Sequence, residues 1–299
     1  MDKIGFIGLG IMGRPMAKNL IKAGYAVVVC DVNQQAVEEL RACGAESAAT
    51  PAETAEKAGT FIVTMLPNSP QVREVTAGEN GLLKGIRAGQ IVVDMSSISP
   101  IASRELDALL REKGAEMLDA PVSGGQEKAE QGTLAIMVGG SAAAFEKARP
   151  ILEKMGATVT LVGESGAGQI TKLVNQMIVG INISAVAEGM AFAKKAGVEP
   201  RRVFEAIRKG LAGSQCLEDK APRMFEGRYD PGFRINLHIK DLWNVLETSR
   251  AVSCSVPLSG QVIEMMIALA NEGHETKDHG SLGLYYEKLN NVALKEIQK

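Results

Sequence analysis

A glycine-rich segment near the N-terminus has the spacing that binds a diphosphate. It ends a short apolar run that starts at Lys3 and opens a segment of helical periodicity, and it reads Gly8-Leu9-Gly10-Ile11-Met12-Gly13. In a G-x-G-x-x-G segment the first glycine permits a tight turn. The second lets the backbone approach a pyrophosphate, and the third lets helix and strand pack closely. The helix N-terminus then faces the anion. A glycine turn without a ligand is the alternative interpretation.

Asp31 favours a dinucleotide over a plain turn. It follows the apolar run Ala26 to Cys30 and lies about 20 residues after the last glycine, where a carboxylate bonds the adenosine ribose hydroxyls. Its charge would oppose a 2′-phosphate, and the next residues, Val32, Asn33 and Gln34, carry no positive charge. We therefore expect NAD as cofactor, with NADH preferred and NADPH possible.

Lys172 is the candidate acid–base group. It lies in the early turns of a long helical pattern that follows the glycine-rich segment Gly163 to Gly168, with Asn175 three residues on and Gln176 four on. These positions share one face of a helix. An ammonium there can donate a proton to a carbonyl oxygen, and the neutral amine can remove one from a hydroxyl. The alternative is a solvent-exposed lysine, which is the common case, but the apolar neighbours in the helix weaken it.

A third cluster, Asp119 to Gly125, follows an expected strand at the carboxyl edge of the sheet, where ligands bind in doubly wound folds. The hydroxyl of Ser123 and the bare backbone of Gly124 and Gly125 would suit a substrate carboxylate. A plain turn explains the proline and the two glycines equally well.

The three histidines, His238, His274 and His279, lack the spacing of metal ligands, and we expect no metal site. His238 is interpreted as structural. Lys240 and Asp241, in the same expected helix, could be a solvated pair.

Composition excludes several classes of protein. The chain has 299 residues and a net charge of −2, so the basic surface of a nucleic-acid-binding protein is absent. No basic region leads into an apolar one at the N-terminus, and polar residues interrupt the apolar stretch 173–192, so neither a secretory signal nor a membrane span is expected. Four scattered cysteines are typical of reduced thiols. We expect a cytoplasmic protein without nucleic-acid or membrane partners.

The periodicity predicts two different halves. Short apolar strands alternate with helices to about residue 163, which is typical of βαβ units and a mostly parallel sheet of the Rossmann type. After that no strand is expected. One long helix, Ala167 to Lys195, is expected to join the domains. Further helices are expected over 200–209, 236–252, 260–271 and 281–297. The domains expected are 1–163, which binds the dinucleotide, and 164–299, an all-helical substrate and oligomerisation domain.

Taken together, these motifs resemble those of the β-hydroxyacid dehydrogenase family, in the same order and over nearly the whole chain. The matching segments are GFIGLGIMGRPMAKNL (5–20), DAPVSGG (119–125), GAGQITKLVNQ (166–176) and KDL (240–242).

The resemblance implies a role for each matching residue. Lys172 is the acid–base residue and Asn175 orients the substrate. The implied substrate-binding residues are Ser123, Gly124, Gly125 and Gln176. The implied cofactor-binding residues are the glycine segment with Asp31, Met65, Leu66, Ser97 and Lys240. The family's amide often stands four residues after the lysine, where this chain has Gln176, so either amide can be the orienting one.

The resemblance also implies a substrate and an assembly. The substrate is a small carboxylated aldehyde or hydroxyacid, and the protein is a homodimer or homotetramer. The lysine amine is expected to meet the reactive end of a dinucleotide held by the N-terminal sheet. A non-catalytic dinucleotide sensor is the alternative of another class, and the presence of Lys172 counts against it.

Overall fold

The computed structural model describes residues 2–296. The chain folds into two compact units that divide between Lys172 and Leu173, inside one long helix. Each unit has its own hydrophobic core. The boundary expected after residue 163 stays a prediction.

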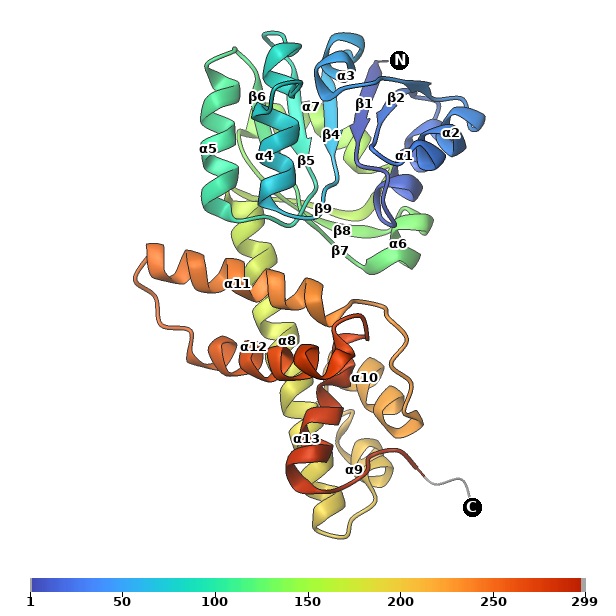
Figure 1. The fold of residues 1–299 in the computed structure, drawn as a ribbon, viewed down its shortest axis with the longest axis vertical. Coiled ribbons are helices and arrows are strands. Elements are labelled where there is room, and N and C mark those ends of the chain that lie inside the picture. The colour runs from blue at the N-terminus through green and yellow to red at the C-terminus, as the bar shows by residue number, and fades with distance from the viewer. Residues whose placement is uncertain (1, 297–299) are drawn as a thin grey trace. The chain divides into compact units, whose positions relative to one another are not determined.

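The first unit is built on one mostly parallel sheet (Figure 1). Its spatial order is β3-β2-β1-β4-β5-β6-β8-β7, and β9 pairs with β8. The chain leaves β1 first toward β2 and β3 and then toward β4, β5 and β6, so β1 is the point where the winding reverses. The strands are β1 (Lys3–Ile7), β2 (Ala26–Cys30), β3 (Glu46–Ser47), β4 (Phe61–Thr64), β5 (Ile91–Asp94), β6 (Glu116–Asp119), β7 (Val122–Ser123), β8 (Leu134–Gly139) and β9 (Gly156–Gly163).

Helices cover both faces of this sheet, as the continuous apolar strands predicted. Along β4, Ile62 packs into the core formed with α3, α4 and α5, whereas Val63 packs into the core formed with α1, α2, α6 and α7. Figure 1 shows α4 and α5 side by side on one face. The helices are α1 (Gly13–Lys22), α2 (Gln34–Ala42), α3 (Pro51–Lys57), α4 (Ser69–Ala77), the 3₁₀ turn η1 (Leu82–Lys84), α5 (Pro100–Arg111), α6 (Gly125–Gln131) and α7 (Ala142–Leu152).

The strand register brings four carboxyl ends to one edge. Ile7 of β1 pairs with Thr64 of β4, Thr64 with Asp94 of β5, and Asp94 with Asp119 of β6. The segments that follow these strands therefore begin next to one another. Beyond them, β8 runs antiparallel to β6 and β7 and parallel to β9.

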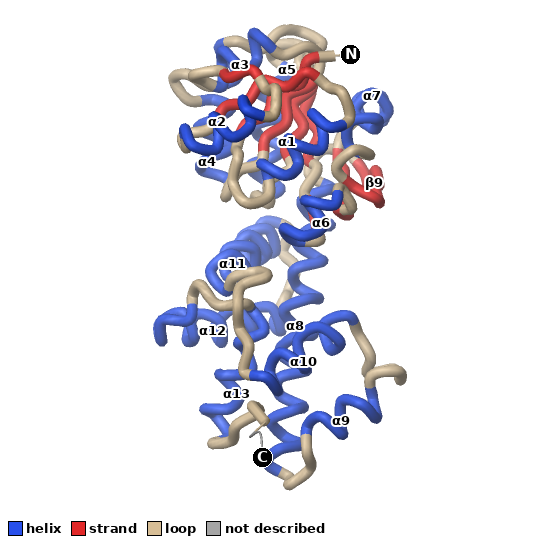
Figure 2. Tube along the Cα trace, turned by 90° about the vertical axis from the view of Figure 1, so that its right-hand side faces the viewer, coloured by secondary structure: helices blue, strands red, loops and turns tan. Residues whose placement is uncertain are grey.

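The second unit is helical, and no strand occurs in it among the described residues (Figure 2). The helix α8, which begins in the first unit, has the predicted bounds, and the helical character expected after residue 163 is confirmed. The elements are α8 (Ala167–Lys195), α9 (Pro200–Ile207), α10 (Gln215–Glu226), α11 (Ile235–Ala251), α12 (Pro257–Leu269), a π turn η2 (Ala270–His274), the 3₁₀ turn η3 (His279–Ser281) and α13 (Leu282–Asn290).

Two elements of the second unit differ most from the sequence prediction. The last helix was expected over 281–297 but ends at Asn290, because Asn291 takes the left-handed conformation (φ 50°) that stops a helix. Ile297 lies outside the described residues. Helix α10 was not predicted at all; its N-cap is Ser214, whose hydroxyl accepts the Leu217 N–H.

By length and composition α8 could cross a membrane, and it is the one helix in residues 2–296 that could. A core helix of a soluble protein meets the same criterion. Leu173, Ile183 and Met190 of α8 pack in the core of the second unit. We therefore interpret α8 as a core helix.

Candidate active site

The glycine segment takes the conformation that its spacing predicts. Gly8 has φ +96°, and a Cβ there would overlap the Met65 carbonyl. A Cβ on Gly13 would overlap the carbonyl oxygen of Gly8, so the start of α1 packs directly on the turn. A Cβ on Gly10 would meet nothing within 4 Å, and Ile11 is exposed. The open side of the loop thus lies at Gly10, where a pyrophosphate would approach.

No side chain caps α1, and its first turn holds no acidic residue. The N-terminus of a helix carries unpaired N–H groups and a partial positive charge, which bind phosphate. The loop and the helix start therefore fit the diphosphate of a dinucleotide.

Asp31 is held at the end of β2 by backbone donors. Its carboxylate accepts the N–H of Leu9 in the glycine segment and, at 2.7 Å, the N–H of Asn33. The side chain of Val32 beside it is fully exposed. The carboxylate is half-buried next to the loop, in the place that an adenosine ribose requires.

The three other predicted cofactor residues of this unit follow β4 and β5. The N–H of Met65 donates to Ile7 O at 2.9 Å, and the N–H of Leu66 donates to the hydroxyl of Ser96 at 2.8 Å. Ser97 comes next along the chain and is half-buried. The structure brings these residues to the edge that carries the glycine segment.

Ser123, Gly124 and Gly125 follow β6 at the same edge. Ser123 ends the short strand β7 and pairs with Ala135 of β8, while Gly124 (φ +142°) and Gly125 (φ +72°) need backbone angles that favour glycine. A Cβ on Gly125 would meet nothing within 4 Å, so this backbone is accessible.

The start of α8 is fastened to this edge by two buried side chains. Asp119, at the end of β6, accepts the N–H of Gly166 and the N–H of Gln169, both at 2.7 Å. The amide of Gln169 donates to Ser96 O at 2.8 Å and accepts the Ile98 N–H at 3.0 Å. The first turn of α8 is thereby bonded to the segments that follow β5 and β6.

Lys172 lies one turn after Gln169, and its side chain is 6% exposed. Residues three apart lie on one side of a helix. The exposed-lysine interpretation is therefore wrong. Lysine is rarely buried, and Lys172 is buried next to the turn that is bonded to the sheet edge. It is therefore the leading candidate for chemistry on α8.

Burial raises the pKa of Asp119 from 3.8 to about 6, although the two backbone donors oppose this. Folding therefore favours the protonated form of Asp119. The stability that this side chain contributes is fully present below about pH 4 and is lost as the pH rises through about 6. We expect the unfolding free energy of wild type, relative to Asp119→Asn, to fall by up to about 3 kcal/mol between these pH values. Urea titrations of both proteins measure it; a difference that does not change with pH would contradict this.

In the second unit Gln176 joins two side chains. Its Oε1 accepts the Asn175 side-chain N–H at 2.7 Å, and its Nε2 donates to Asp241 at 2.7 Å. The other Asp241 oxygen lies 3.0 Å from the Lys240 ammonium. Gln176 and Asp241 are buried, whereas Asn175 is half-buried. The solvated Lys240–Asp241 pair considered from the sequence is wrong, because the Asp241 carboxylate is buried.

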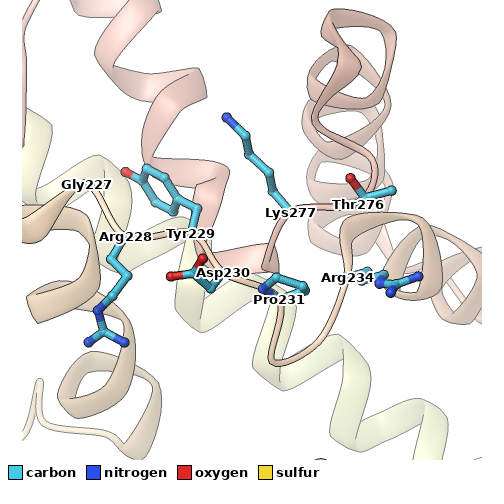
Figure 3. A pocket seen from close by; sticks show the side chains of 8 residues that line it. All are labelled: Gly227, Arg228, Tyr229, Asp230, Pro231, Arg234, Thr276 and Lys277. Atoms are coloured by element: carbon cyan, nitrogen blue, oxygen red, sulfur yellow. The ribbon is translucent and has the colours of Figure 1, made fainter. Parts of the chain in front are cut away.

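The second unit also contains a hollow of about 600 Å³ (Figure 3). It is lined by Gly227, Arg228, Tyr229, Asp230, Pro231, Arg234, Thr276 and Lys277. In Figure 3 the Arg228 and Lys277 side chains point in different directions. No predicted site residue in the described chain lines it. Within residues 2–296 no group of three His, Cys, Asp or Glu side chains could hold a metal ion.

Comparison with known families covers almost the whole chain. Residues 3–163 match the NAD-binding domain of 6-phosphogluconate dehydrogenase, and residues 166–285 match the NAD-binding domain of NADP-dependent 3-hydroxyisobutyrate dehydrogenase. The chain is 45% identical to 2-hydroxy-3-oxopropionate reductase of Escherichia coli, over 94% of this chain and 95% of the relative. The chain belongs to the β-hydroxyacid dehydrogenase family. It is therefore an NAD(P)-dependent oxidoreductase, and the family predicted from the motifs is confirmed.

Two further relatives indicate the range of the family. An NAD-dependent L-serine dehydrogenase of Pseudomonas aeruginosa is 39% identical over 93% of this chain and 95% of the relative. Among solved structures, 3-hydroxyisobutyrate dehydrogenase of Mycobacterium tuberculosis with L-serine has a TM-score of 0.89. It is 31% identical, covering 95% of this chain and 98% of that one. The fold predicted from the sequence is confirmed.

Sequence reasoning gave no role to Gln169 or to the carboxylates of Asp119 and Asp241. Asp119 belongs to the cluster Asp119 to Gly125 and lies at the end of an apolar strand. A carboxylate at that position could have indicated a buried acceptor for the N–H groups at a helix start. Gln169 offers no such signal, because its partners are more than 70 residues away.

Proposed function

We propose that this enzyme catalyses the reversible reduction of tartronate semialdehyde (2-hydroxy-3-oxopropanoate) to glycerate with NADH. The observation that carries the proposal is the attachment of the Lys172 turn of α8 to the sheet edge that bears the glycine segment. The similarity to the Escherichia coli reductase supports the substrate. The amino-acid sequences of segments 64–72, 78–81, 94–100, 209–214 and 231–242 also resemble those of such reductases.

The cofactor, when bound, supplies a hydride to the aldehyde carbon. The glycine segment with Asp31, Met65, Leu66 and Ser97 would hold it, with Lys240 toward the nicotinamide end. Negative charge then develops on the carbonyl oxygen. The Lys172 ammonium stabilises that charge and donates the proton, which combines electrostatic stabilisation with acid catalysis. In the oxidation direction the neutral amine removes the hydroxyl proton.

Asn175 is the amide that orients the substrate in this proposal. Gln176 is buried, and its amide oxygen and amide nitrogen each make a hydrogen bond within the protein, so its side chain is less accessible to a ligand than that of Asn175. Asn175 is half-buried and is held by Gln176. Gln176 therefore acts through Asn175. Ser123, Gly124 and Gly125 hold the substrate carboxylate through the hydroxyl and backbone N–H groups.

The test of the activity is a substrate panel with purified enzyme. We expect NADH oxidation with tartronate semialdehyde at a higher kcat/KM than with glyoxylate, succinic semialdehyde or methylmalonate semialdehyde. Oxidation of L-serine is measured in the same panel, since one relative carries that name. If the enzyme prefers another compound, the proposed substrate is wrong and the enzyme has another substrate of the β-hydroxyacid dehydrogenase family. No turnover with any would favour the sensor alternative.

We expect NADH to be preferred over NADPH in kcat/KM, because Asp31 would repel a 2′-phosphate. Asp31→Asn combined with Val32→Arg should shift the preference toward NADPH, since Val32 is exposed and an arginine there can reach the phosphate. Val32→Gln in the same background is the uncharged control. A wild-type preference for NADPH would defeat this prediction.

The assembly into a dimer or tetramer and the cytoplasmic location stay predictions from the sequence and the resemblance.

A further inference from the structure

A chain of buried polar side chains crosses the second unit and is not used by the proposed reaction. It consists of Lys220 of α10, Asp278, His279 of η3, and His238 of α11, and all four are under 8% exposed. It ends on α8, at the backbone carbonyl of Gln176. Buried charges and imidazoles lose hydration, so such a chain persists only when its hydrogen bonds are satisfied.

Asp278 anchors one end of this chain. Its carboxylate lies 3.0 Å from the Lys220 ammonium and accepts the N–H groups of Gly232 and Phe233, at 3.1 and 3.0 Å. It also accepts the N–H of Gly280 at 2.8 Å. One carboxylate thus fixes α10, the segment that leads into α11, and η3.

The two histidines form the other end. Their Nδ1 atoms are 3.0 Å apart, and Nε2 of His238 lies 3.0 Å from the carbonyl oxygen of Gln176. The Phe233 ring packs against both imidazoles, with ring centroids 5.8 and 5.4 Å away. Burial lowers the pKa of His279 well below its usual value, and the positive charge of Lys220 acts in the same direction.

These contacts determine which nitrogen carries the proton in each neutral ring. A carbonyl oxygen only accepts, so Nε2 of His238 must donate. A neutral imidazole has one N–H, which leaves Nδ1 of His238 as an acceptor. Nδ1 of His279 must then donate to it. A proton added to His238 would place two N–H groups against each other.

His238 lies three residues before Asp241, so the two share one face of α11. That face makes two hydrogen bonds with Gln176. Asp241 accepts the side-chain N–H of Gln176, and His238 donates to its backbone carbonyl oxygen. Gln176 in turn holds Asn175. The residues of α11 therefore fix both the position and the rotation of this turn of α8.

We propose that His238 and His279 are positioning residues, which act through the Gln176 carbonyl to hold Asn175 in place for catalysis. This rests on the proposed role of Asn175. A misplacement of about 1 Å at a reacting group can cost on the order of 100-fold in rate.

The activity test compares variants of the pair. His238→Leu removes both hydrogen bonds, and we expect kcat to fall about 10- to 100-fold while the Kd of NADH is unchanged. His279→Leu should act in the same direction. His279→Asn keeps a donor near the Nδ1 position and should restore kcat toward wild type.

Tyr286→Phe is the matched control. It removes a buried hydrogen bond of 2.8 Å to Ser184, which lies farther along α8. We expect it to lower Tm but to leave kcat unchanged. If His238→Leu lowers Tm by as much as this control and leaves kcat equally unchanged, the histidines are merely structural and the proposal fails.

A second measurement does not depend on turnover. The chain has only three histidines, so ¹⁵N-histidine labelling of the full protein gives few signals. At neutral pH we expect His238 as the Nε2–H tautomer and His279 as the Nδ1–H tautomer. Any other tautomer of His238, or a charged ring in either residue, would overturn the proposal. The activity assays use whichever panel substrate the wild-type enzyme turns over. If the wild-type enzyme is inactive with every panel substrate, the proposed function fails. If the wild-type enzyme is active and His238→Leu is equally active, the inference about the histidines fails.

Discussion

Lys172→Ala is expected to lower kcat by about 10²- to 10⁴-fold, the usual cost of losing an acid–base group. The variant leaves the carbonyl oxygen without a proton donor and without the positive charge that stabilises the developing negative charge. The Kd of NADH is expected to stay near the wild-type value, because the glycine segment and Asp31 are untouched. Stopped-flow reduction of the aldehyde gives kcat, and fluorescence titration gives the Kd.

Two variants separate chemistry from packing. Lys194→Ala removes a lysine near the end of the same helix, where it pairs with Glu199 at 3.4 Å on the surface, and should leave kcat unchanged. Lys172→Met keeps the length of the buried side chain but not the amine, and should be as inactive as the alanine variant. Near-normal turnover in Lys172→Met would remove Lys172 from the acid–base role.

The elements that bind the cofactor could be predicted from local sequence. A strand, three glycines, a helix and an acidic residue follow one another within about 30 residues, as one βαβ unit does. Each of these signals is local, because the backbone angles of Gly8 and the close packing at Gly13 leave few other residue types at those positions. The alternation of strands and helices then predicts the parallel sheet.

What the sequence could not predict depends on contacts between distant segments. From the sequence alone, Gln169 is only a polar residue in an apolar helix. Its role becomes visible when its two hydrogen-bond partners after β5 are known. His238 shows no metal spacing and was interpreted as structural; its bonds to Gln176 and His279 join residues 62 and 41 positions apart. Tertiary packing alone determines such pairings, and the hydrophobic periodicity of the sequence does not predict them.

Gly13→Ala is expected to abolish tight NADH binding and to lower the unfolding free energy by about 1–3 kcal/mol, the usual cost of overpacking. The added Cβ would overlap the Gly8 carbonyl oxygen, and it would also crowd the Phe6 ring at 3.2 Å. Backbone and a buried ring cannot yield as an exposed side chain does. The turn must therefore open, and the N–H groups of α1 move away from the diphosphate.

Gly10→Ala tests the same loop without this overlap. Nothing lies within 4 Å of its Cβ, and Gly10 does not use a positive φ, so the unfolding free energy should match wild type. The methyl group occupies the side from which a pyrophosphate approaches, so we expect the Kd of NADH to rise about tenfold, which corresponds to about 1.4 kcal/mol. Urea unfolding and NADH titration of both variants separate the two effects. If Gly10→Ala bound NADH as tightly as wild type, the diphosphate would lie elsewhere, and the dinucleotide geometry assigned to this edge would have to be abandoned.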